Sequence, residues 1–425
     1  MNIMVIGSGG REHAIITALK KNSKVKHIFA LPGNGGIASI AKCVPIGATE
    51  IDKQIEFAKK NKIDFAVVIP DDPLVLGAVD ALEKAGIPCF GPNKNAAIIE
   101  GSKAFSKALM KKYNIPTADY EVFENSKDAI NYLNHYSKMP VVIKADGLAL
   151  GKGVIIAQSK EEALNAVVSI MEEHKFGISG NQIVIEEFLD GVEISVLSFT
   201  DGKTIVPMIS SMDHKRALDN DEGLNTGGMG TVAPNPFYTD EIAKECQEKI
   251  YKPTIDAMNK EGRTFKGCLY FGLILTSDGI RVIEYNCRFG DPETQVVLPL
   301  LESDLLDIMI ATQNGTLTKD MVRFGSDSAC CVIMASKGYP VAYSKGYKIN
   351  IPKNLSSEIY FAGAKLDANN DLITSGGRVL GVVAKSNSLY SAIVKAYEDV
   401  QKVSFDNSYN RNDIGKKALQ KKISL

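Results

Sequence analysis

The sequence predicts a multidomain protein that combines α/β and α+β segments. Three observations predict this fold class. The chain has 425 residues, a length typical of two to four domains at roughly 150 residues each. Its first hundred residues alternate short apolar runs with helical patterns, and such alternation predicts a parallel, doubly wound sheet. The region after about residue 325 is rich in strand patterns and closes with a helix, which predicts a β-rich α+β unit.

The first unit is predicted to span residues 1–101. Strand patterns cover 2–6, 27–31, 65–69 and 88–90, and helix patterns cover 12–21, 51–61 and 74–85. The turn sequence GPN at 91–93 then interrupts the pattern, because glycine and proline favour turns over regular elements. Ser102 follows as a helix cap, and the helix that it opens is predicted to run to about Tyr113.

A second unit is predicted over residues 102–325, with a smaller lid over about 120–190. Its strand patterns lie at 140–144, 153–157 and 182–188, and its hairpin turns lie at Asp201-Gly202 and Asp278-Gly279. Ser159 and Glu162 form a capping box that opens a helix to about residue 173. The last unit, residues 326–425, has strand patterns at 329–335, 359–364 and 378–384 and a helix pattern at 389–400.

Composition narrows the function classes. Forty-nine Lys and Arg nearly balance fifty Asp and Glu, so the chain lacks the basic excess of a dedicated nucleic-acid binder. No apolar run approaches the ~20 residues that span a bilayer, and the first residues lack the pattern of a signal peptide. Seven cysteines without a CxxC pair and five histidines without HxxxH spacing support neither a disulfide framework nor a zinc site. We therefore expect a cytoplasmic protein without nucleic-acid or membrane partners.

A glycine-rich turn, GSGGREH at 7–13, joins the first predicted strand to the first helix. Glycines allow a tight turn there, and a helix N-terminus offers free N–H groups to an anion. A dinucleotide-binding turn would have a further glycine where Glu12 stands. Arg11 is unfavourable at a helix N-terminus unless a negative group lies between them. The turn therefore either joins strand to helix only or, as we prefer, binds a small phosphorylated ligand.

Two further segments could surround a nucleotide. KADGLALGKGV at 144–154 carries two lysines on a glycine-rich turn between strands, which suits a polyphosphate. It lacks the GxxxxGK[ST] pattern of a P-loop and could equally be a structural hairpin. Four acidic residues between Glu186 and Glu193 either form a solvated strand edge or belong to a nucleotide site. In the second case the backbone of this stretch would meet an adenine edge and Glu193 would meet the ribose.

The strand pattern at 281–286 is the candidate for a metal site. Alternation along a strand puts Glu284 and Asn286 on one face, with Cβ atoms about 6–7 Å apart. Two hard oxygen ligands at that spacing suit Mg²⁺, whose remaining positions water and phosphate fill; the alternative is a polar outer face. RFGDPE at 288–293 follows this strand directly, and DHKR at 213–216 and NTGGMG at 225–230 lie in loops of the kind that often carry function.

Taken together, these segments resemble the ATP-grasp superfamily, and within it the glycinamide ribonucleotide synthetase family. The matching motifs are GSGGREH at 7–13, PGNGG at 32–36, GSKAF at 101–105, KADGLALGKGV at 144–154, EEFLDGVE at 186–193, DHKR at 213–216, NTGGMG at 225–230, EYNCRFGDPETQ at 284–295 and TSGGRVLGV at 374–382. The resemblance spans nearly the whole chain, and its specificity lies in the joint order of the motifs. It implies an N-terminal Rossmann-like (pre-ATP-grasp) domain, an ATP-grasp core with a mobile lid subdomain, and a C-terminal domain that closes the cleft.

The resemblance implies a carbon–nitrogen ligase of de novo purine biosynthesis. Such an enzyme joins glycine to 5-phosphoribosylamine through a glycyl phosphate intermediate, with ATP as co-substrate and Mg²⁺ or Mn²⁺ as metal; a monomer is expected. The residues carried over for ATP are Lys103, Lys144, Lys152, Gly153, Glu186, Glu187, Phe188, Leu189 and Glu193, and those for the metal are Glu284 and Asn286. Those for the substrates are Gly9, Gly10, Arg11, Asn34, Gly228, Gly290, Asp291 and Pro292, and those for catalysis are Arg288, Lys215 and Asp213.

Three positions depart from the family pattern. The segment YFG at 270–272 has no carboxylate where many ATP-grasp enzymes carry a further metal ligand, so the metal would rely on two protein ligands. Asp71 stands where the family usually has glutamate, which shortens the side chain, and Leu224 stands where proline or threonine is commoner.

Two alternatives come from other functional classes. A nicotinamide-dependent oxidoreductase would need a glycine in place of Glu12 and an acidic residue at the end of the second strand, and the chain has neither. A catalytically silent nucleotide sensor would not need Lys144, Glu284, Asn286 and Arg288 together. NADH fluorescence titration tests the first alternative, and an ATPase assay with and without glycine tests the second.

Overall fold

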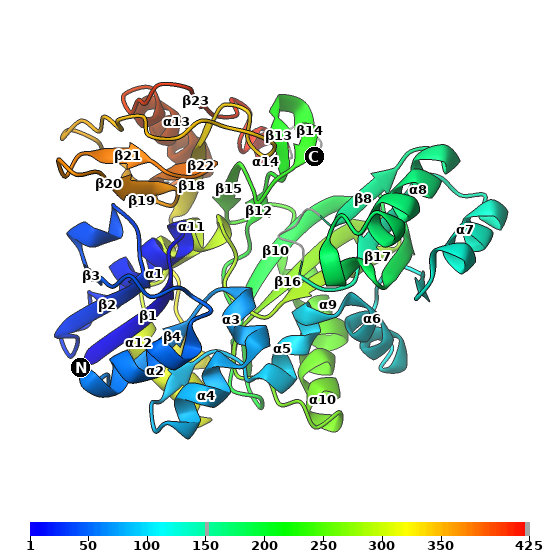
Figure 1. Ribbon diagram of the computed structural model, residues 1–425, viewed down its shortest axis with the longest axis horizontal. Helices are drawn as coiled ribbons and strands as arrows, with labels where there is room; N and C mark the ends of the chain where they lie inside the picture. Colours follow the sequence, from blue (N-terminus) through cyan, green and yellow to red (C-terminus); the bar gives the residue numbers. More distant parts are fainter. Residues whose placement is uncertain (149–152, 421–425) are drawn as a thin grey trace.

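The computed structural model describes residues 1–148 and 153–420 of the chain (Figure 1). The N-terminal segment forms a parallel sheet in the order β3-β2-β1-β4-β5. Its elements are β1 (Asn2–Gly7), α1 (Gly10–Leu19), β2 (His27–Pro32), β3 (Lys42–Cys43), α2 (Ile51–Lys60), β4 (Phe65–Val68), α3 (Asp71–Leu76), α4 (Ala78–Lys84) and β5 (Cys89–Phe90). Ile3 and Val5 pack towards α1, whereas Met4 and Ile6 pack towards α2 and α4. Helices therefore cover both faces, and the predicted doubly wound sheet is confirmed.

Two helices of this region differ from the prediction. The helix expected over 74–85 is divided into α3 and α4 at Gly77, whose φ of 93° lies in the left-handed region. A right-handed helix cannot continue through such a residue. An additional helix, α5 (Lys94–Gly101), is capped by the Asn93 side chain. It ends just before Ser102, which caps α6 (Lys103–Lys112) as predicted.

The central segment contains two four-stranded sheets, in the orders β11-β10-β16-β17 and β6-β9-β7-β8. The first sheet consists of β10 (Val192–Thr200), β11 (Ile205–Pro207), β16 (Gly267–Thr276) and β17 (Gly279–Asn286), with α9 (Asp240–Cys246) and α10 (Lys252–Lys260) nearby. The second sheet consists of β6 (Tyr120–Phe123), β7 (Val141–Ala145), β8 (Val154–Ala157) and β9 (Ile183–Glu187), with α7 (Ser126–His135) and α8 (Lys160–Val167). The second sheet has a buried core of its own and forms the lobe at the right of Figure 1. This lobe corresponds to the predicted lid range, and its mobility stays a prediction.

The C-terminal segment shares a sheet with two strands of the central segment. The sheet has the order β12-β15-β18-β22-β19, and β23 pairs with β18. Its strands are β12 (Met212–Asp213), β15 (Gly230–Ala233), β18 (Ser328–Ser336), β19 (Glu358–Phe361), β22 (Arg378–Ser386) and β23 (Ser408–Tyr409), with α13 (Leu389–Val400) packed on β18 and β22. A division of the chain near residue 325 therefore cuts across one sheet in space, and the domain limits stay a proposal.

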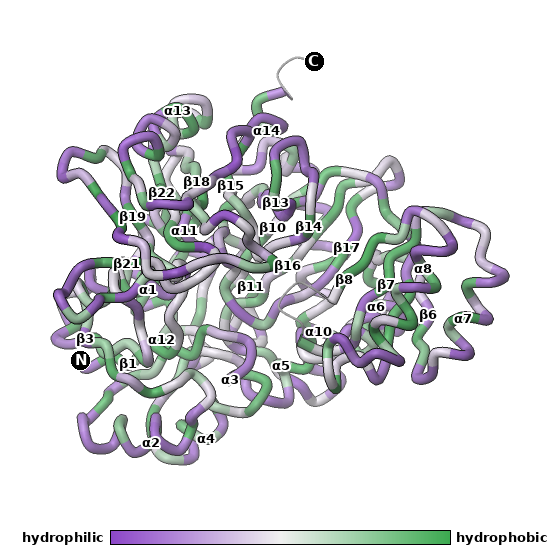
Figure 2. Tube along the Cα trace, turned by 45° about the horizontal axis from the view of Figure 1, so that its top comes forward, coloured by the Kyte–Doolittle hydropathy of each residue, from purple (hydrophilic) through white to green (hydrophobic). Residues whose placement is uncertain are grey.

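The remaining strands form two hairpins, β13-β14 and β20-β21, and three further α-helices are present. They are β13 (Arg216–Leu218), β14 (Glu222–Asn225), α11 (Glu293–Val297), α12 (Leu305–Asn314), β20 (Ala364–Leu366), β21 (Leu372–Thr374) and α14 (Lys416–Gln420). One buried core contains Ile15 of α1, Tyr270 of β16 and Cys331 of β18, so the three segments pack on each other directly. Figure 2 shows apolar stretches along the central strands and polar stretches along the outer loops.

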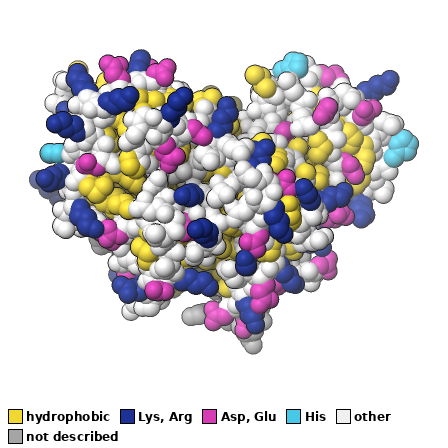
Figure 3. All heavy atoms as spheres, turned by 90° about the horizontal axis from the view of Figure 1, so that it is seen from below, with side chains coloured by type: hydrophobic (Ala, Val, Ile, Leu, Met, Phe, Trp, Pro, Cys, Tyr) yellow, Lys and Arg dark blue, Asp and Glu magenta, His cyan; other side chains and the backbone are white. Residues whose placement is uncertain are grey.

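The surface carries charges of both signs. Seen from below, Lys and Arg side chains are mixed with Asp and Glu, and the outline is indented between the body of the molecule and the lobe at the right (Figure 3). This mixture agrees with the near balance of acidic and basic residues in the sequence. Among the described residues, no helix is long and apolar enough to cross a membrane.

Candidate active site

Strand β17 carries the two predicted metal ligands on its more accessible face. Tyr285 is buried in the core with Phe271, whereas Glu284 and Asn286 on either side of it stay partly exposed. Glu284 lies opposite Gly272 of β16, where a Cβ would come within 3.0 Å of Glu284 Cγ. The missing side chain at Gly272 therefore leaves room for the Glu284 carboxylate above the sheet.

Positive charge surrounds Glu284. Lys215 Nζ lies 3.7 Å from Glu284 Oε1 and 3.2 Å from Glu193 Oε2. Burial works to raise the pKa of Glu284, but Lys215 and three other cations outweigh it and lower that pKa. The three are the predicted site residues Lys144, Lys103 and Arg288. Four cations near one partly open face suit the binding of a polyphosphate, which could take the place of their carboxylate partners.

The oxygen donors on β17 fit a hard divalent cation. Carboxylate and amide oxygens are ligands that suit Mg²⁺ and Mn²⁺. Within 1–148 and 153–420, no group of three or more His, Cys, Asp and Glu side chains could hold a metal ion. A cation bound by Glu284 and Asn286 would therefore take its other ligands from water and phosphate, which is a common arrangement for Mg²⁺.

Arg288 is held by a buried carboxylate that no sequence motif predicted. Its Nη2 lies 3.2 Å from Glu100 Oε1, and its Nη1 donates to the Phe289 carbonyl at 3.2 Å. Burial disfavours the charge of Arg288, but nearby acidic groups, of which Glu100 has the largest effect, together outweigh burial and raise the pKa of the guanidinium. Glu100 also accepts the backbone N–H of Cys287 at 2.7 Å. The only sequence signal for Glu100 is its place directly before the GSKAF motif, because a lone acid in an apolar helix forms no pattern.

The start of α6 and the loop after β7 meet at the predicted phosphate site. Lys103 Nζ donates to the Gly147 carbonyl at 2.8 Å. Asp146 accepts from Ser102 Oγ at 3.0 Å and from the backbone N–H of Ala104 at 2.9 Å. These bonds place Lys103 beside the glycine-rich turn, where the two segments could cradle phosphate together.

Lys144 is paired with Glu186 inside the lid sheet. Lys144 Nζ lies 3.0 Å from Glu186 Oε2, and Lys107 Nζ lies 2.9 Å from the same oxygen. All three side chains are almost fully buried. Burial lowers the pKa of Lys107 to about 8. Lys107 was not predicted, because a lysine in an amphipathic helix is usually solvated and only the folded chain shows its acidic partner.

The remaining predicted nucleotide residues follow β9. Glu187 Oε1 accepts the backbone N–H of Asp119 at 3.0 Å, so its carboxylate supports the strand rather than pointing freely into solvent. Phe188 is exposed and Leu189 is partly exposed, which leaves this stretch accessible to a planar base. Gly153 lies buried just before β8, and Lys152 lies outside the described residues.

The glycine-rich turn before α1 meets the RFGDPE turn. The backbone N–H of Arg11 donates to Asp291 Oδ2 at 3.3 Å, and a Cβ at Gly9 would lie 3.3 Å from the same oxygen. A Cβ at Gly10 would come within 2.6 Å of Gln295 Nε2. Glycine at both positions therefore permits an approach of the two turns that a side chain would obstruct.

The NTGGMG loop at 225–230 also packs against the RFGDPE turn. Gly228 has a φ of +108°, and a Cβ there would come within 2.4 Å of Pro292 Cδ and 2.7 Å of Asp213 Oδ1. A Cβ at Gly290 would come within 2.4 Å of Glu293 Oε2. Tertiary folding thus brings most of the predicted substrate residues into one cluster.

Two arginines link this cluster to the metal strand. Arg11 Nη1 donates to the Phe289 carbonyl at 3.1 Å, and Arg288 Nη1 donates to the same oxygen at 3.2 Å. Arg11 Nε also lies 2.7 Å from Glu12 Oε1, so the residue that replaces the third glycine of a dinucleotide turn orients Arg11. The cation-rich face of β17 and the glycine-lined cluster therefore adjoin.

Asn34 acts as a brace in this structure. Its Nδ2 donates to the carbonyls of Ser8 and Phe361 at 2.8 Å each. Its Oδ1 accepts the backbone N–H groups of Gly36 and Ile37 at 2.9 Å each. These four bonds use the hydrogen-bonding capacity of the amide, so its predicted contact with a substrate stays a prediction.

Asp213 belongs to a buried acidic network. Burial raises the pKa of Asp213 well above its usual value, and Glu293 raises it further while Lys215 opposes the shift. Glu293 Oε1 accepts a hydrogen bond from Ser195 Oγ at 3.3 Å, and Ser195 Oγ lies 2.9 Å from the Tyr270 hydroxyl. Asp213 is therefore able to hold a proton at a pH where an exposed aspartate is ionised.

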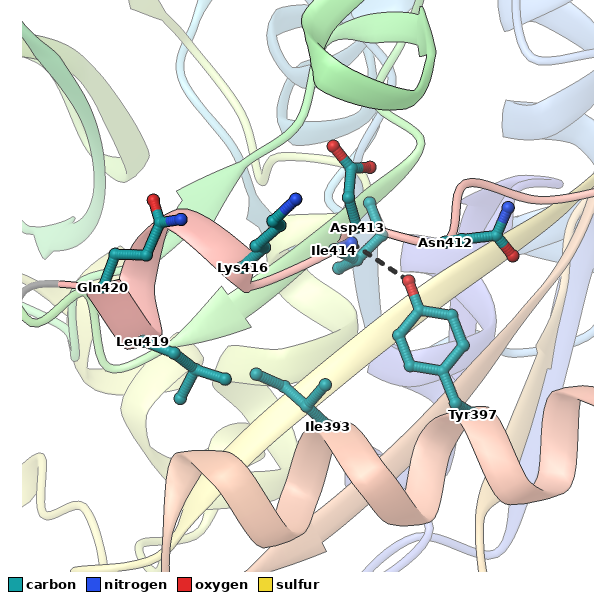
Figure 4. A pocket seen from close by; sticks show the side chains of 8 residues that line it. All are labelled: Ile393, Tyr397, Asn412, Asp413, Ile414, Lys416, Leu419 and Gln420. Carbon is teal, nitrogen blue, oxygen red and sulfur yellow. Dashed lines mark hydrogen bonds between the residues drawn. The ribbon is translucent and has the colours of Figure 1, made fainter.

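A cavity of about 330 Å³ lies apart from this cluster, beside α13 and α14. Figure 4 shows its lining, in which the Tyr397 hydroxyl accepts the backbone N–H of Ile414 at 3.0 Å. Its other lining residues are Ile393, Asn412, Asp413, Lys416, Leu419 and Gln420. None of these residues belongs to the predicted site.

Three models of one family cover this chain. The phosphoribosylglycinamide synthetase N domain matches residues 1–100, its ATP-grasp (A) domain matches residues 101–294, and its C domain matches residues 329–417. This chain belongs to the phosphoribosylglycinamide synthetase family. The resemblance inferred from the sequence motifs is thereby confirmed, and so is the multidomain fold class with an ATP-grasp core.

Relatives that match this chain over their full length are named as enzymes. A phosphoribosylamine–glycine ligase of Clostridium acetobutylicum is 47% identical over 98% of this chain and 100% of that protein. One of Fusobacterium nucleatum is 46% identical over 98% of each chain. The crystal structure of a phosphoribosylamine–glycine ligase from Thermotoga maritima has a TM-score of 0.85 and 34% identity, and covers 97% of this chain and 100% of that one.

More distant structures share the fold alone. Biotin carboxylase from Campylobacter jejuni, solved as a β,γ-ATP complex, has a TM-score of 0.75 at 13% identity and covers 96% of this chain and 92% of that one. The fold of this chain is thus shared by a structure with little sequence identity to it.

Proposed function

We propose that this chain is a phosphoribosylamine–glycine ligase of purine biosynthesis. It converts ATP, glycine and 5-phosphoribosylamine to ADP, phosphate and glycinamide ribonucleotide. One observation carries the proposal: the cation-rich face of β17 adjoins the glycine-lined cluster at the Phe289 carbonyl. This arrangement supports neighbouring sites for a nucleotide and for a phosphorylated amine. The names of the full-length relatives support the same reaction.

The ATP end comprises the lid sheet and β17. Lys103 and Lys144 bind the phosphates, the backbone after β9 meets adenine, and Glu193 meets the ribose. Glu284 and Asn286 would hold Mg²⁺ or Mn²⁺, which would supply positive charge near the phosphates. Lys144 leaves its pairing with Glu186 when phosphate arrives, and Lys107 then remains as the partner of that carboxylate.

The chemistry requires an activated carboxylate, because a free carboxylate is a poor electrophile. An oxygen of glycine attacks the γ-phosphorus of ATP, the bond to ADP breaks, and glycyl phosphate forms. The amine of phosphoribosylamine then attacks the carbonyl carbon, phosphate leaves, and the amine gives up one proton. Arg288 stabilises charge on the transferring phosphoryl group. Asp213, whose pKa burial raises, takes the proton.

Coupled measurement of ADP release tests the proposed reaction. ADP should form at a sustained rate only when glycine and freshly made phosphoribosylamine are both present, and glycinamide ribonucleotide should form in equal amount. Omission of either substrate should stop turnover. Sustained ADP release without glycine, or none with all three substrates, would contradict the proposal.

Isotope labelling tests the proposed intermediate. Direct phosphorylation of the carboxylate predicts that one glycine oxygen leaves with the phosphate. Glycine labelled with ¹⁸O in its carboxylate should therefore transfer one labelled oxygen to inorganic phosphate per turnover, which shifts the ³¹P resonance. Unlabelled phosphate, or AMP with pyrophosphate, would indicate an adenylate or an enzyme-bound intermediate instead.

Replacement of Arg11 by alanine tests the substrate end. A charge-assisted contact to phosphate is typically worth ~1.5–3 kcal/mol, so the KM for phosphoribosylamine should rise roughly 10- to 150-fold. The KM for ATP should hardly change. Lys20→Ala is a matched control, because Lys20 is exposed at the far end of the same helix. If the KM for ATP rises instead, the turn before α1 serves the nucleotide.

We also propose that the enzyme acts as a monomer in the cytoplasm, without nucleic-acid or membrane partners. The balanced charge of the sequence supports the absence of a nucleic-acid partner. Light scattering at working concentration tests the monomer, and a stable dimer would contradict it. Fractionation of the source cells tests the location.

A further inference from the structure

One matched motif, TSGGRVLGV at 374–382, has no role in the reaction described so far. Its arginine, Arg378, begins β22 in the C-terminal segment and reaches the substrate cluster from there. Arg378 Nη1 donates to the Gly227 carbonyl at 2.7 Å and to the Asp291 carbonyl at 2.9 Å. The same nitrogen lies 3.2 Å from Asp291 Oδ1 and 3.3 Å from the Gly228 carbonyl.

The NTGGMG loop is shaped around this guanidinium. A Cβ at Gly227 would come within 2.9 Å of Arg378 Cζ, so any larger residue there would displace the arginine. The backbone N–H of Gly227 donates to the Tyr339 hydroxyl at 3.1 Å, which is a second contact between the loop and the C-terminal segment. The loop and the C-terminal segment therefore fit each other closely at this point.

The ion pair between Arg378 and Asp291 stabilises the contact between the loop and the C-terminal segment. Burial disfavours the charge of Arg378, but Asp291, Tyr339, Asp213 and Glu293 together outweigh burial and raise the pKa of the guanidinium. Burial also works to raise the pKa of Asp291, and Arg378 and Arg11 together lower it. An ion pair that is largely removed from water is favourable only when further hydrogen bonds support it. Here Asp291 accepts from Gln295 Nε2 and from the backbone N–H of Arg11, and Arg378 Nη1 donates to the Asp291 carbonyl.

We propose that Arg378 is a positioning residue for the phosphoribosylamine end of the site. It joins Asp291 and the Gly227–Gly228 backbone, while Asp291 in turn accepts the backbone N–H of Arg11. Three segments distant in sequence are thus held in one geometry, and the C-terminal segment completes the site. Without Arg378 the two loops would have to become ordered when the substrate binds, which weakens binding. This inference rests on the proposed ligase function.

The experiment varies each substrate in turn for Arg378→Met, Arg378→Lys and the wild-type enzyme. For Arg378→Met the KM for phosphoribosylamine should rise roughly 10- to 100-fold, while the KM for ATP stays within about twofold. Arg378→Lys keeps the charge and should recover part of the loss. Lys385→Met is the matched control on the same strand, because Lys385 is exposed, and it should behave as the wild type.

Two further measurements separate positioning from a general loss of structure. Thermal midpoints identify any variant that no longer folds, and calorimetry measures the affinity for the stable product, glycinamide ribonucleotide. The double variant Arg378→Met with Asp291→Asn should lose less binding free energy for glycinamide ribonucleotide than the two single variants lose in sum, because the two residues act as one unit. An unchanged KM for phosphoribosylamine in folded Arg378→Lys and Arg378→Met would overturn the inference, as would an equal rise in both KM values. If Arg378→Met does not fold, an unchanged KM in Arg378→Lys alone would overturn it. Failure of the wild-type enzyme to make glycinamide ribonucleotide would instead overturn the proposed function.

Discussion

Replacing Arg288 by methionine is expected to lower kcat about 10³-fold, because an arginine that stabilises a transferring phosphoryl group typically raises kcat by at least that factor. Glu100 and the Phe289 carbonyl hold the guanidinium, so it is preorganised before the substrate binds. Methionine keeps most of the volume and removes the charge. The KM for ATP should change far less than kcat, because the lysines still bind the phosphates.

Arg323→Met provides the control for this experiment, since Arg323 is exposed and its backbone bonds to Glu302 and Ser303, outside β17. Thermal midpoints should be compared first, because Arg288→Met leaves Glu100 buried without its cation, and a lone buried charge is destabilising. The double replacement Arg288→Met with Glu100→Gln removes that problem and should restore stability without restoring kcat. Wild-type turnover in either folded variant would exclude Arg288 from the phosphoryl transfer.

Replacing Glu284 by glutamine is expected to lower turnover by about 100-fold or more at limiting Mg²⁺, because loss of an outer ligand alone commonly has an effect of that size. Glutamine preserves the shape above Gly272 and removes the charge that attracts the metal. Excess Mg²⁺ or Mn²⁺ should recover part of the activity, since weaker binding is offset by mass action. Activity as a function of metal concentration measures the effect.

Glu248→Gln is the matched control, because Glu248 is an exposed glutamate in the helical segment Gln247–Tyr251 and not on β17. The thermal midpoint of Glu284→Gln should remain close to that of the wild type, since the side chain is partly exposed. Turnover equal to wild type at limiting metal, with an unchanged midpoint, would remove Glu284 from the metal site.

Several elements could be predicted from local sequence because local forces specify them. The helix Leu389–Val400 has the predicted limits, and the Ser388 side chain caps it. Ser102 caps α6 through the backbone N–H of Phe105, and the hairpin turn near Gly279 joins β16 to β17 as expected. The alternation around Tyr285 places Glu284 and Asn286 on one face, which depends only on the strand geometry.

Other features depend on partners far along the chain. Gly77 breaks a helix that an apolar pattern alone would continue, and Asn93 caps a short helix that the preceding turn sequence obscured. Lys107 and Glu100 look like surface charges in the sequence, yet each is buried against an opposite charge from another element. Pairing of this kind has no period and no motif, so only the folded chain reveals it.

The sequence by itself determined the family, the order of the segments and the residue types of the site, because those are carried by short motifs and by periodicities of the backbone. The tertiary structure alone decided how the segments share one sheet and one site. β15 pairs with β18 across the expected domain limit, and Arg378 reaches Gly227 and Asp291 from a strand far along the chain. The physical reason is that burial of charge and polar backbone is costly unless most donors find acceptors, and the partners of these residues come together only when distant segments pack.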